Sequence, residues 1–268
     1  MAFDVNNFVV NRFLRGTMFD TNNGKMLWSV NQITDPTLTM SADEISAVDA
    51  IGVEIMAFER AKNAEFGASN ALFDLGLLAA QAGTQKKIAT GDAKIIAPRV
   101  EEIIVTEGMT EVTLKEVPVG TKTNEIPFIY ALNGDNTLGT AYAIGASATA
   151  TTFALNATLK SLTIPTGLTA GTRLFVMYEY EADDAVEVAA SANDFPSAGK
   201  FVLEVLGVDV CNPSKVYHAY LIFPQAKLLS NFDLTLNTEM THPFTLKAMQ
   251  QYCDYEKKLF RIVIPNEE

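Results

Sequence analysis

The chain has few of the residues from which metal sites, disulfide frameworks and sugar-binding platforms are usually built. Among 268 residues there are two cysteines, two histidines and one tryptophan. Two cysteines, Cys211 and Cys253, are too few for a disulfide-rich scaffold. Their spacing with His218 and His242 matches no common zinc pattern, and neither cysteine follows a glycine-rich elbow or a helix start that would lower its pKa. We therefore expect structural roles for all four, and no catalytic, cofactor-binding or metal-binding residue.

Positive charge is also scarce. Lys and Arg number 20 against 32 Asp and Glu, which gives a net charge of −12 and an isoelectric point near 4.7. Such a chain has no cationic excess with which to displace counterions from nucleic acid, although DNA can slide past an acidic surface without sticking. Residues 1–15 show neither a basic start nor a long apolar run, and the apolar stretch Ala71–Ala82 is too short for a membrane span. We expect a soluble protein made in a reducing compartment, used without export and without a membrane partner.

What the chain does have is 48% hydrophobic residues arranged mostly in short alternating runs between turn residues. This texture predicts a mainly β fold of the sandwich or barrel type. Thr21-Asn22-Asn23-Gly24 predicts a hairpin turn, because Asn and Gly tolerate positive φ. Near the end, Thr245–Tyr252 and Lys258–Ile264 predict a long hairpin turning at Asp254–Lys257, although Thr241 could also cap a helix at that point. Phe232–Leu236 alternates and is predicted as a further strand.

One helix is expected, at about residues 69–82. Ser69 or Asn70 can cap it, Leu72, Phe73, Leu75 and Leu78 follow at helical spacing, and Gly83 stands where a left-handed C-terminal residue is wanted. The helix is almost uncharged, so it must lie against a sheet or another subunit. Upstream, Ser41–Val53 is expected to be a loop between two extended segments, folded onto its own domain or reaching out to a neighbour.

Strand length and charge change along the sequence and divide the chain into two parts. Residues 98–190 have shorter strands and carry 12 acidic and 5 basic residues, so this stretch holds a net −7 of the total charge. We expect it to be a small inserted Ig-like β-module, within a discontinuous β domain formed by residues 1–97 and 191–268.

Motifs that carry chemistry are missing from the sequence. It contains no G-x-x-x-x-G-K-[ST], no G-x-G-x-x-G after a strand and no H-E-x-x-H. Asn133-Gly134-Asp135-Asn136 resembles part of a calcium loop but lacks its late bidentate Glu, so a hairpin turn is the better interpretation. The acidic cluster Glu179, Glu181, Asp183, Asp184 and Glu187 is the best candidate for a hydrolase, yet neighbouring carboxylates at a strand end usually just face water.

Several stretches resemble virion structural proteins of long-tailed bacteriophages, and most of all their tail tube (major tail) proteins. These stretches lie at both ends of the chain and are Phe13–Phe19 (FLRGTMF), Leu27–Leu38 (LWSVNQITDPTL), Ala64–Gln81 (AEFGASNALFDLGLLAAQ), Ala219–Lys227 (AYLIFPQAK) and Thr241–Ala248 (THPFTLKA). None of them is a catalytic motif.

The resemblance implies a β-sandwich with one packed helix, whose copies close into hexameric rings that stack into a tube. DNA would pass through the lumen without specific binding. The implied partners are further copies of the chain and other tail proteins, namely terminator, initiator or baseplate, and a tape measure or sheath. The protein would be made in the host bacterial cytoplasm, end in the virion tail, and need no enzyme activity and no cofactor.

Other assignments stay open at this point. The chain could be a capsid decoration or other minor virion protein with an Ig-like module. A host-surface or carbohydrate-binding module is a further alternative, although the single tryptophan, Trp28, argues against a sugar platform.

Overall fold

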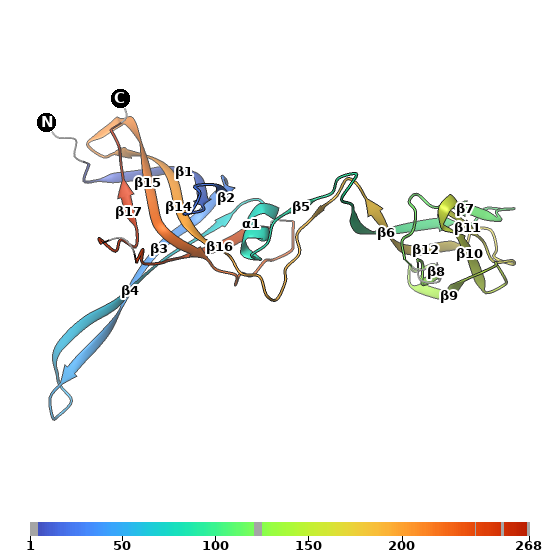
Figure 1. The fold of residues 1–268 in the computed structure, drawn as a ribbon, viewed down its shortest axis with the longest axis horizontal. Helices are drawn as coiled ribbons and strands as arrows, with labels where there is room; N and C mark the ends of the chain where they lie inside the picture. The colour runs from blue at the N-terminus through green and yellow to red at the C-terminus, as the bar shows by residue number, and fades with distance from the viewer. Residues whose placement is uncertain (1–4, 121–124, 239, 253–254, 267–268) are drawn as a thin grey trace. The chain divides into compact units, whose positions relative to one another are not determined.

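The computed structural model describes residues 5–120, 125–238, 240–252 and 255–266 (Figure 1). Strand makes up 55% and helix 4%, with one α-helix among the described residues, which confirms the expected mainly β fold. The chain separates into two compact units. Unit 1 comprises Met1–Lys86 and Val188–Glu268, and unit 2 comprises Lys87–Glu187.

Unit 1 is built on one eight-stranded sheet of order β2-β1-β14-β15-β16-β4-β3, with β17 paired to β15. All the strand pairings in this sheet are antiparallel. Its elements are β1 (Phe8–Phe19), β2 (Met26–Val30), β3 (Ile33–Val48), β4 (Glu54–Asn70), α1 (Leu75–Gln81), β14 (Ala198–Asp209), β15 (Asn212–Leu228), β16 (His242–Ala248) and β17 (Arg261–Val263).

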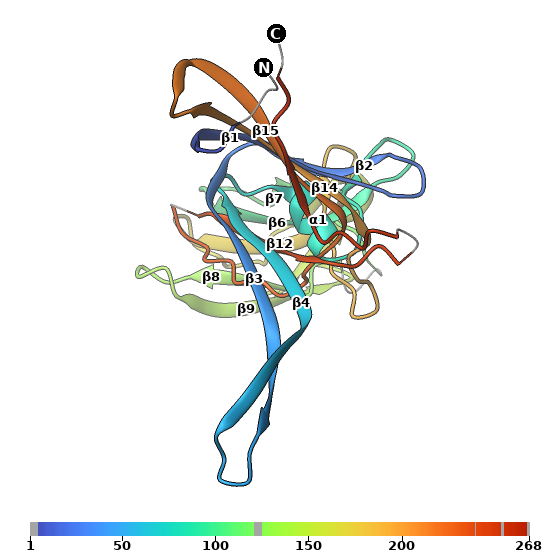
Figure 2. The same cartoon turned by 90° about the vertical axis from the view of Figure 1, so that its left-hand side faces the viewer.

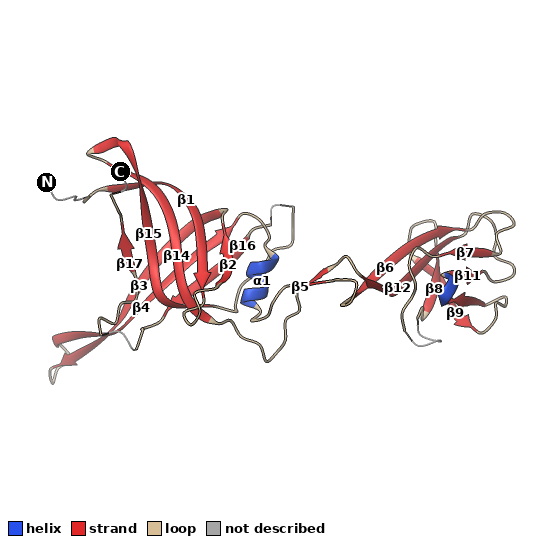
Figure 3. Ribbon diagram, turned by 45° about the horizontal axis from the view of Figure 1, so that its top comes forward, coloured by secondary structure: helices blue, strands red, loops and turns tan. Residues whose placement is uncertain are grey.

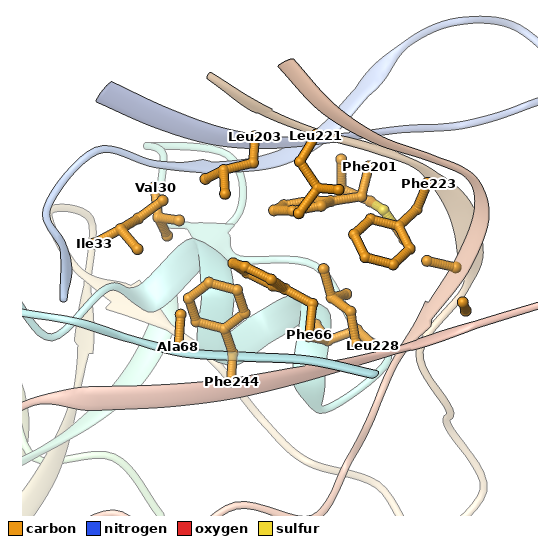
Figure 4. Close-up of a cluster of buried hydrophobic side chains, with 14 of the residues drawn as sticks. Val30, Ile33, Phe66, Ala68, Phe201, Leu203, Leu221, Phe223, Leu228 and Phe244 are labelled. Carbon is orange, nitrogen blue, oxygen red and sulfur yellow. The ribbon is translucent and has the colours of Figure 1, made fainter. Parts of the chain in front are cut away.

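This sheet curls over its own apolar face. Phe201, Leu203 and Val205 alternate along β14 toward the core, and the same alternation runs along β15. The rings of Trp28 on β2 and Phe244 on β16 lie 5.7 Å apart although three strands separate β2 from β16 in the sheet. Figure 4 shows the side chains of the two layers pointing toward one another, so the sheet forms a sandwich with itself.

The N-terminal hairpin confirms the predicted turn at Thr21–Gly24. Gly24 has φ +70°, and the Asp20 carboxylate accepts hydrogen bonds from the Asn22 N–H and the Asn23 side-chain amide. Strand β1 continues through Gly16, where a Cβ would come within 3.0 Å of the Phe201 ring. The glycine therefore admits a core aromatic side chain and does not interrupt the strand.

The helix is shorter than the predicted 69–82. It spans Leu75–Gln81, and its cap is Asp74, whose carboxylate accepts the Leu77 N–H, so the caps predicted at Ser69 or Asn70 were wrong. Those two residues end β4, paired with Pro243 and His242 of β16. Sheet pairing outweighs local helix propensity here, whereas Gly83 does have the expected positive φ, +71°.

The predicted loop at Ser41–Val53 and the C-terminal hairpin also need correction. Residues 41–53 belong mostly to a β3–β4 ribbon, and only its tip is a turn. Strands β16 and β17 do not pair with each other, because both pair with β15. Phe232–Leu236 is not a strand. In the predicted turn Asp254–Lys257, Asp254 lies outside the described residues.

Unit 2 contains a seven-stranded sheet of order β6-β12-β8-β9-β10-β11-β7, in which only the β9–β10 pairing is parallel (Figure 3). A separate core made largely of Ile129, Phe153, Leu162 and Leu174 holds it together. Its elements are β5 (Lys87–Ile88), β6 (Ile95–Ile104), β7 (Glu111–Thr113), β8 (Phe128–Leu132), β9 (Leu138–Gly145), β10 (Thr152–Asn156), the 3-10 turn η1 (Ala157–Leu159), β11 (Ser161–Thr163), β12 (Arg173–Ala182) and β13 (Val186–Glu187), which pairs with β5.

Candidate functional site

The cysteines and histidines, which are the residues best suited to bind a metal ion or act as nucleophiles, are not brought together. Cys211 is free and exposed at the β14–β15 turn, His218 lies on β15 and His242 on β16, while Cys253 is outside the described residues. Among the described residues, no three His, Cys, Asp or Glu side chains are placed to hold a metal ion. None of the helices in this described part has the length and apolarity that a membrane-spanning helix needs.

His242 instead fastens the helix to the sheet. The ring is fully buried, its Nδ1 accepts the Asp74 N–H at 3.3 Å, and its Nε2 donates to Gln81 Oε1 at 2.7 Å. Gln81 in turn donates to the carbonyl of Pro243 at 2.9 Å, and the Phe73 ring stacks on the imidazole. Burial lowers the pKa of His242, and the nearby Asp74 carboxylate opposes this only in part. The arrangement therefore requires the neutral ring.

Stability of unit 1 is expected to fall as the pH drops below about 6.5, because the unfolded chain then gains a proton on this histidine that the folded chain resists. His242→Phe should remove this component and cost about 1–3 kcal/mol at pH 7.5, since the Asp74 N–H and Gln81 lose their partner. Thermal unfolding at pH 7.5 and 5.5 of both proteins measures the difference. An equal loss in the two proteins would contradict the assignment.

Two members of the acidic cluster on β12 and β13 pair with neighbouring lysines. Glu181 lies 3.4 Å from Lys94 and Glu187 lies 3.5 Å from Lys87, with all four side chains substantially exposed. In the Asn133–Asn136 turn, the Asp135 carboxylate accepts hydrogen bonds from the Thr137 N–H and hydroxyl, which lowers its pKa. Asp135 is therefore occupied by its own turn, as the hairpin interpretation predicted.

A buried carboxylate does occur in unit 2. Glu101 is 8% exposed and accepts hydrogen bonds from the Tyr178 hydroxyl and from the Lys115 N–H, the latter at 3.0 Å. The Tyr178 oxygen accepts the Glu116 N–H at 3.1 Å, and desolvation together with the Glu101 contact raises the tyrosine pKa. Glu101 and Tyr178 thus anchor the backbone at residues 115–116 to the sheet, which is a structural role.

Tyr178→Phe is expected to destabilise unit 2 by about 1–3 kcal/mol, because it leaves the Glu116 N–H and the buried Glu101 carboxylate without this partner. Tyr130→Phe is the matched control, since the Tyr130 hydroxyl makes no hydrogen bond to another described residue and the side chain is only half-buried. Calorimetric unfolding of the two variants makes the comparison. Equal midpoints would show that the Tyr178 hydroxyl contributes nothing to stability.

The most exposed part of the β3–β4 ribbon is its distal part, residues 41–63, which we call the arm. It extends beyond the rest of unit 1 in Figure 2, and each of its residues except Asp49 is exposed. The apolar side chains Ile45, Ile55, Met56 and Phe58 are 39%, 68%, 54% and 56% exposed. Isolated apolar residues are common on protein surfaces. A projecting ribbon with several exposed apolar side chains close together instead indicates an interaction site.

The arm has a turn that is held by hydrogen bonds at its tip, and it has a defined apolar face. At the tip, the Asp49 carboxylate accepts the N–H groups of Ile51 and Val53 at 2.9 and 2.8 Å, and Gly52 has φ +87°. In the ribbon Ile45 lies opposite Phe58, and Ala47 lies opposite Met56. Directly opposed residues share a face, so these four form one apolar stripe. The sequence analysis expected a loop at Ser41–Val53 and missed the ribbon.

Comparison with known proteins gives one family. The sequence model of the YomU/Tube protein family matches residues 9–262, which is nearly the whole chain. No curated protein matches the sequence.

Proposed function

The chain belongs to the YomU/Tube protein family, and from that premise we propose that it is the structural subunit of a phage tail tube. Copies of the chain form stacked rings, hexameric by our proposal, and the rings form the wall of a channel through which DNA passes. The work of such a subunit is assembly, so no catalytic residue or cofactor is required.

The observation that carries this proposal is the arm. A two-stranded ribbon alone is only marginally stable in water, and the residues of this one are exposed within the described part of unit 1, all but Asp49. Burial against a neighbour would stabilise it at about 25 cal/mol per Å² of apolar surface. The same contact repeats at each subunit of a symmetric assembly, so modest pairwise affinities add up to a stable tube.

The acidic composition suits a DNA channel. With a net charge of −12, the chain repels the phosphate backbone, and transit needs contacts that do not hold the polymer. We propose that the other partners are tail proteins at the two ends of the tube and a tape measure or sheath, and that the protein resides in the virion tail.

The experiment that tests this function is negative-stain electron microscopy of the purified chain over a range of concentrations, with light scattering in parallel. The expected result is rings or hollow tubes with a regular axial repeat. A chain that stays monomeric at all concentrations, and that binds empty capsids when these are added, would replace the tube subunit with a capsid decoration protein.

A further inference from the structure

Unit 1 carries a cationic hollow on the outer face of its sheet, the face turned away from the core. The hollow has a volume of about 580 Å³ and is lined by Phe19, Lys200, Ile222, Lys258 and Arg261, with residues of the β1–β2 turn at its edge. Lys200 lies opposite Phe19, and Arg261 lies opposite Ile222. Three cations thus surround an apolar floor.

The positive charge of this face contrasts with the net negative charge of the whole chain. Along β1, Arg15 shares the face with Phe19, but Glu204 lies directly opposite Arg15, so the positive surface is confined to the hollow. Among the described residues, Lys200 and Arg261 make no ion pair and no side-chain hydrogen bond, and Lys258 pairs with Glu256. The Asp20 carboxylate at the rim is held by the Asn22 N–H and the Asn23 amide. In a chain of net charge −12, this positive surface can accept an acidic partner.

The arm has the complementary charge. It carries Asp43, Glu44, Asp49, Glu54 and Glu59, against two basic residues, Arg60 and Lys62, at its base. Glu44 lies directly opposite Glu59 in the ribbon. Like charges in directly opposed positions destabilise a pair of strands, so the Glu44–Glu59 pair lowers the stability of the isolated arm. A cationic surface that contacts both carboxylates would remove this repulsion.

We infer that the arm of one copy docks on the cationic hollow of a second copy. This inference rests on the proposed function and names the surface that receives the arm. The tip residues Ile51 and Val53 meet the apolar floor, and Glu54 meets Lys200 and Arg261.

Glu54 and Glu59 are separated by roughly 15 Å along β4, so the acidic surface of the arm extends beyond its tip. The contact is heterologous, because the arm of each copy meets a different surface on the next. Such contacts close into rings or continue as filaments.

The test uses two charge-reversed full-length variants. The arm variant is Glu54→Lys with Glu59→Lys, and the hollow variant is Lys200→Glu with Arg261→Glu; all four residues are exposed. Each variant alone places like charges in contact and is expected to lose at least tenfold in self-association, measured by sedimentation velocity. An equimolar mixture should regain wild-type association, since each arm then finds an opposite charge on the other variant.

Matched controls carry the same change in charge elsewhere. Glu107→Lys with Glu111→Lys controls for the arm variant, and Lys86→Glu with Lys115→Glu controls for the hollow variant; these residues are exposed too. Both controls should associate as the wild type does. Unchanged association of the arm or hollow variant, or a mixture that does not recover, would overturn the docking.

These outcomes separate the docking from the tube function. Wild-type tubes that persist in both variants would contradict the docking and leave the tube subunit intact. Mixed variants that associate with each other while the wild type forms no ring or tube would support the docking and contradict the tube.

Discussion

Shortening the arm is expected to leave a folded chain that no longer assembles. The change replaces residues 44–59 by an Asn-Gly turn, which joins Asp43 to Arg60, two residues that already lie opposite each other in the β3–β4 ribbon. Asn-Gly favours the two-residue turn that fits a hairpin. The removed residues are exposed except Asp49, so unit 1 loses none of its core.

The effect on assembly should be large. Fully burying an Ile or Phe side chain contributes about 1.5–3 kcal/mol, so loss of Ile45 and Phe58 alone weakens each contact by about 3–6 kcal/mol if the neighbour covers both. About 1.4 kcal/mol corresponds to a factor of ten, so the concentration needed for assembly should rise at least about a hundredfold. Light scattering against concentration, together with electron microscopy, measures that threshold.

A milder variant separates the apolar face from the charges. Ile45→Ser with Phe58→Ser keeps the five carboxylates of the arm and should raise the threshold less than the shortened arm does. The thermal midpoint of unit 1 should stay within a few degrees of the wild type in both variants. Tubes formed by the shortened chain at the wild-type threshold would refute the role of the arm, and a large fall in its midpoint would place the arm in its own core.

Strands that have one buried face can be predicted from the sequence. Phe201–Val205 on β14 and its partners on β15 alternate because every second residue enters the core, and alternation is a local pattern. The Asn22-Asn23-Gly24 turn is equally local, since it depends on which residues tolerate positive φ. Local patterns of this kind account for the correct prediction of the Thr21–Gly24 turn and of the mainly β fold.

Features that depend on residues far away in the sequence, or on another molecule, were not predicted. The arm is exposed on both faces and carries apolar residues on both, since Val48 lies on the face opposite to Ile45 and Ala47, so Ser41–Val53 resembled a loop. Leu72 and Phe73 imitate the start of a helix but are 61% and 37% exposed, because sheet pairing of Ser69 and Asn70 delays the helix to Leu75. The partner of His242, Gln81, stands 161 positions away, and no local pattern connects the two.

Phe66→Ala is expected to have the largest effect on the stability of unit 1. The Phe66 ring is 1% exposed and lies 5.5 Å from Phe201 and 6.2 Å from both Phe223 and Phe244, so it joins the two layers of the curled sheet (Figure 4). Removing a buried phenylalanine side chain costs about 3–5 kcal/mol, from lost burial and from the cavity that remains. Total stabilities of about 5–15 kcal/mol are usual, so the loss is a large fraction of the whole.

The single tryptophan makes this measurable for unit 1 alone. Trp28 is 5% exposed and its ring lies 5.7 Å from the Phe201 ring, so its fluorescence follows the core that contains Phe66, whereas unit 2 has no tryptophan. In urea, Phe66→Ala should lower the midpoint of the fluorescence transition. The matched control is Phe153→Ala, which removes a fully buried ring from the core of unit 2.

The control decides how independent the two cores are. Because Phe153 and Trp28 belong to different clusters, Phe153→Ala should leave the fluorescence midpoint unchanged while it lowers the stability of unit 2 followed by calorimetry. A common shift of both transitions would mean that the units unfold as one cooperative body. Two separate transitions would mean that unit 1, which carries both the arm and the cationic hollow, owes its stability to its own core.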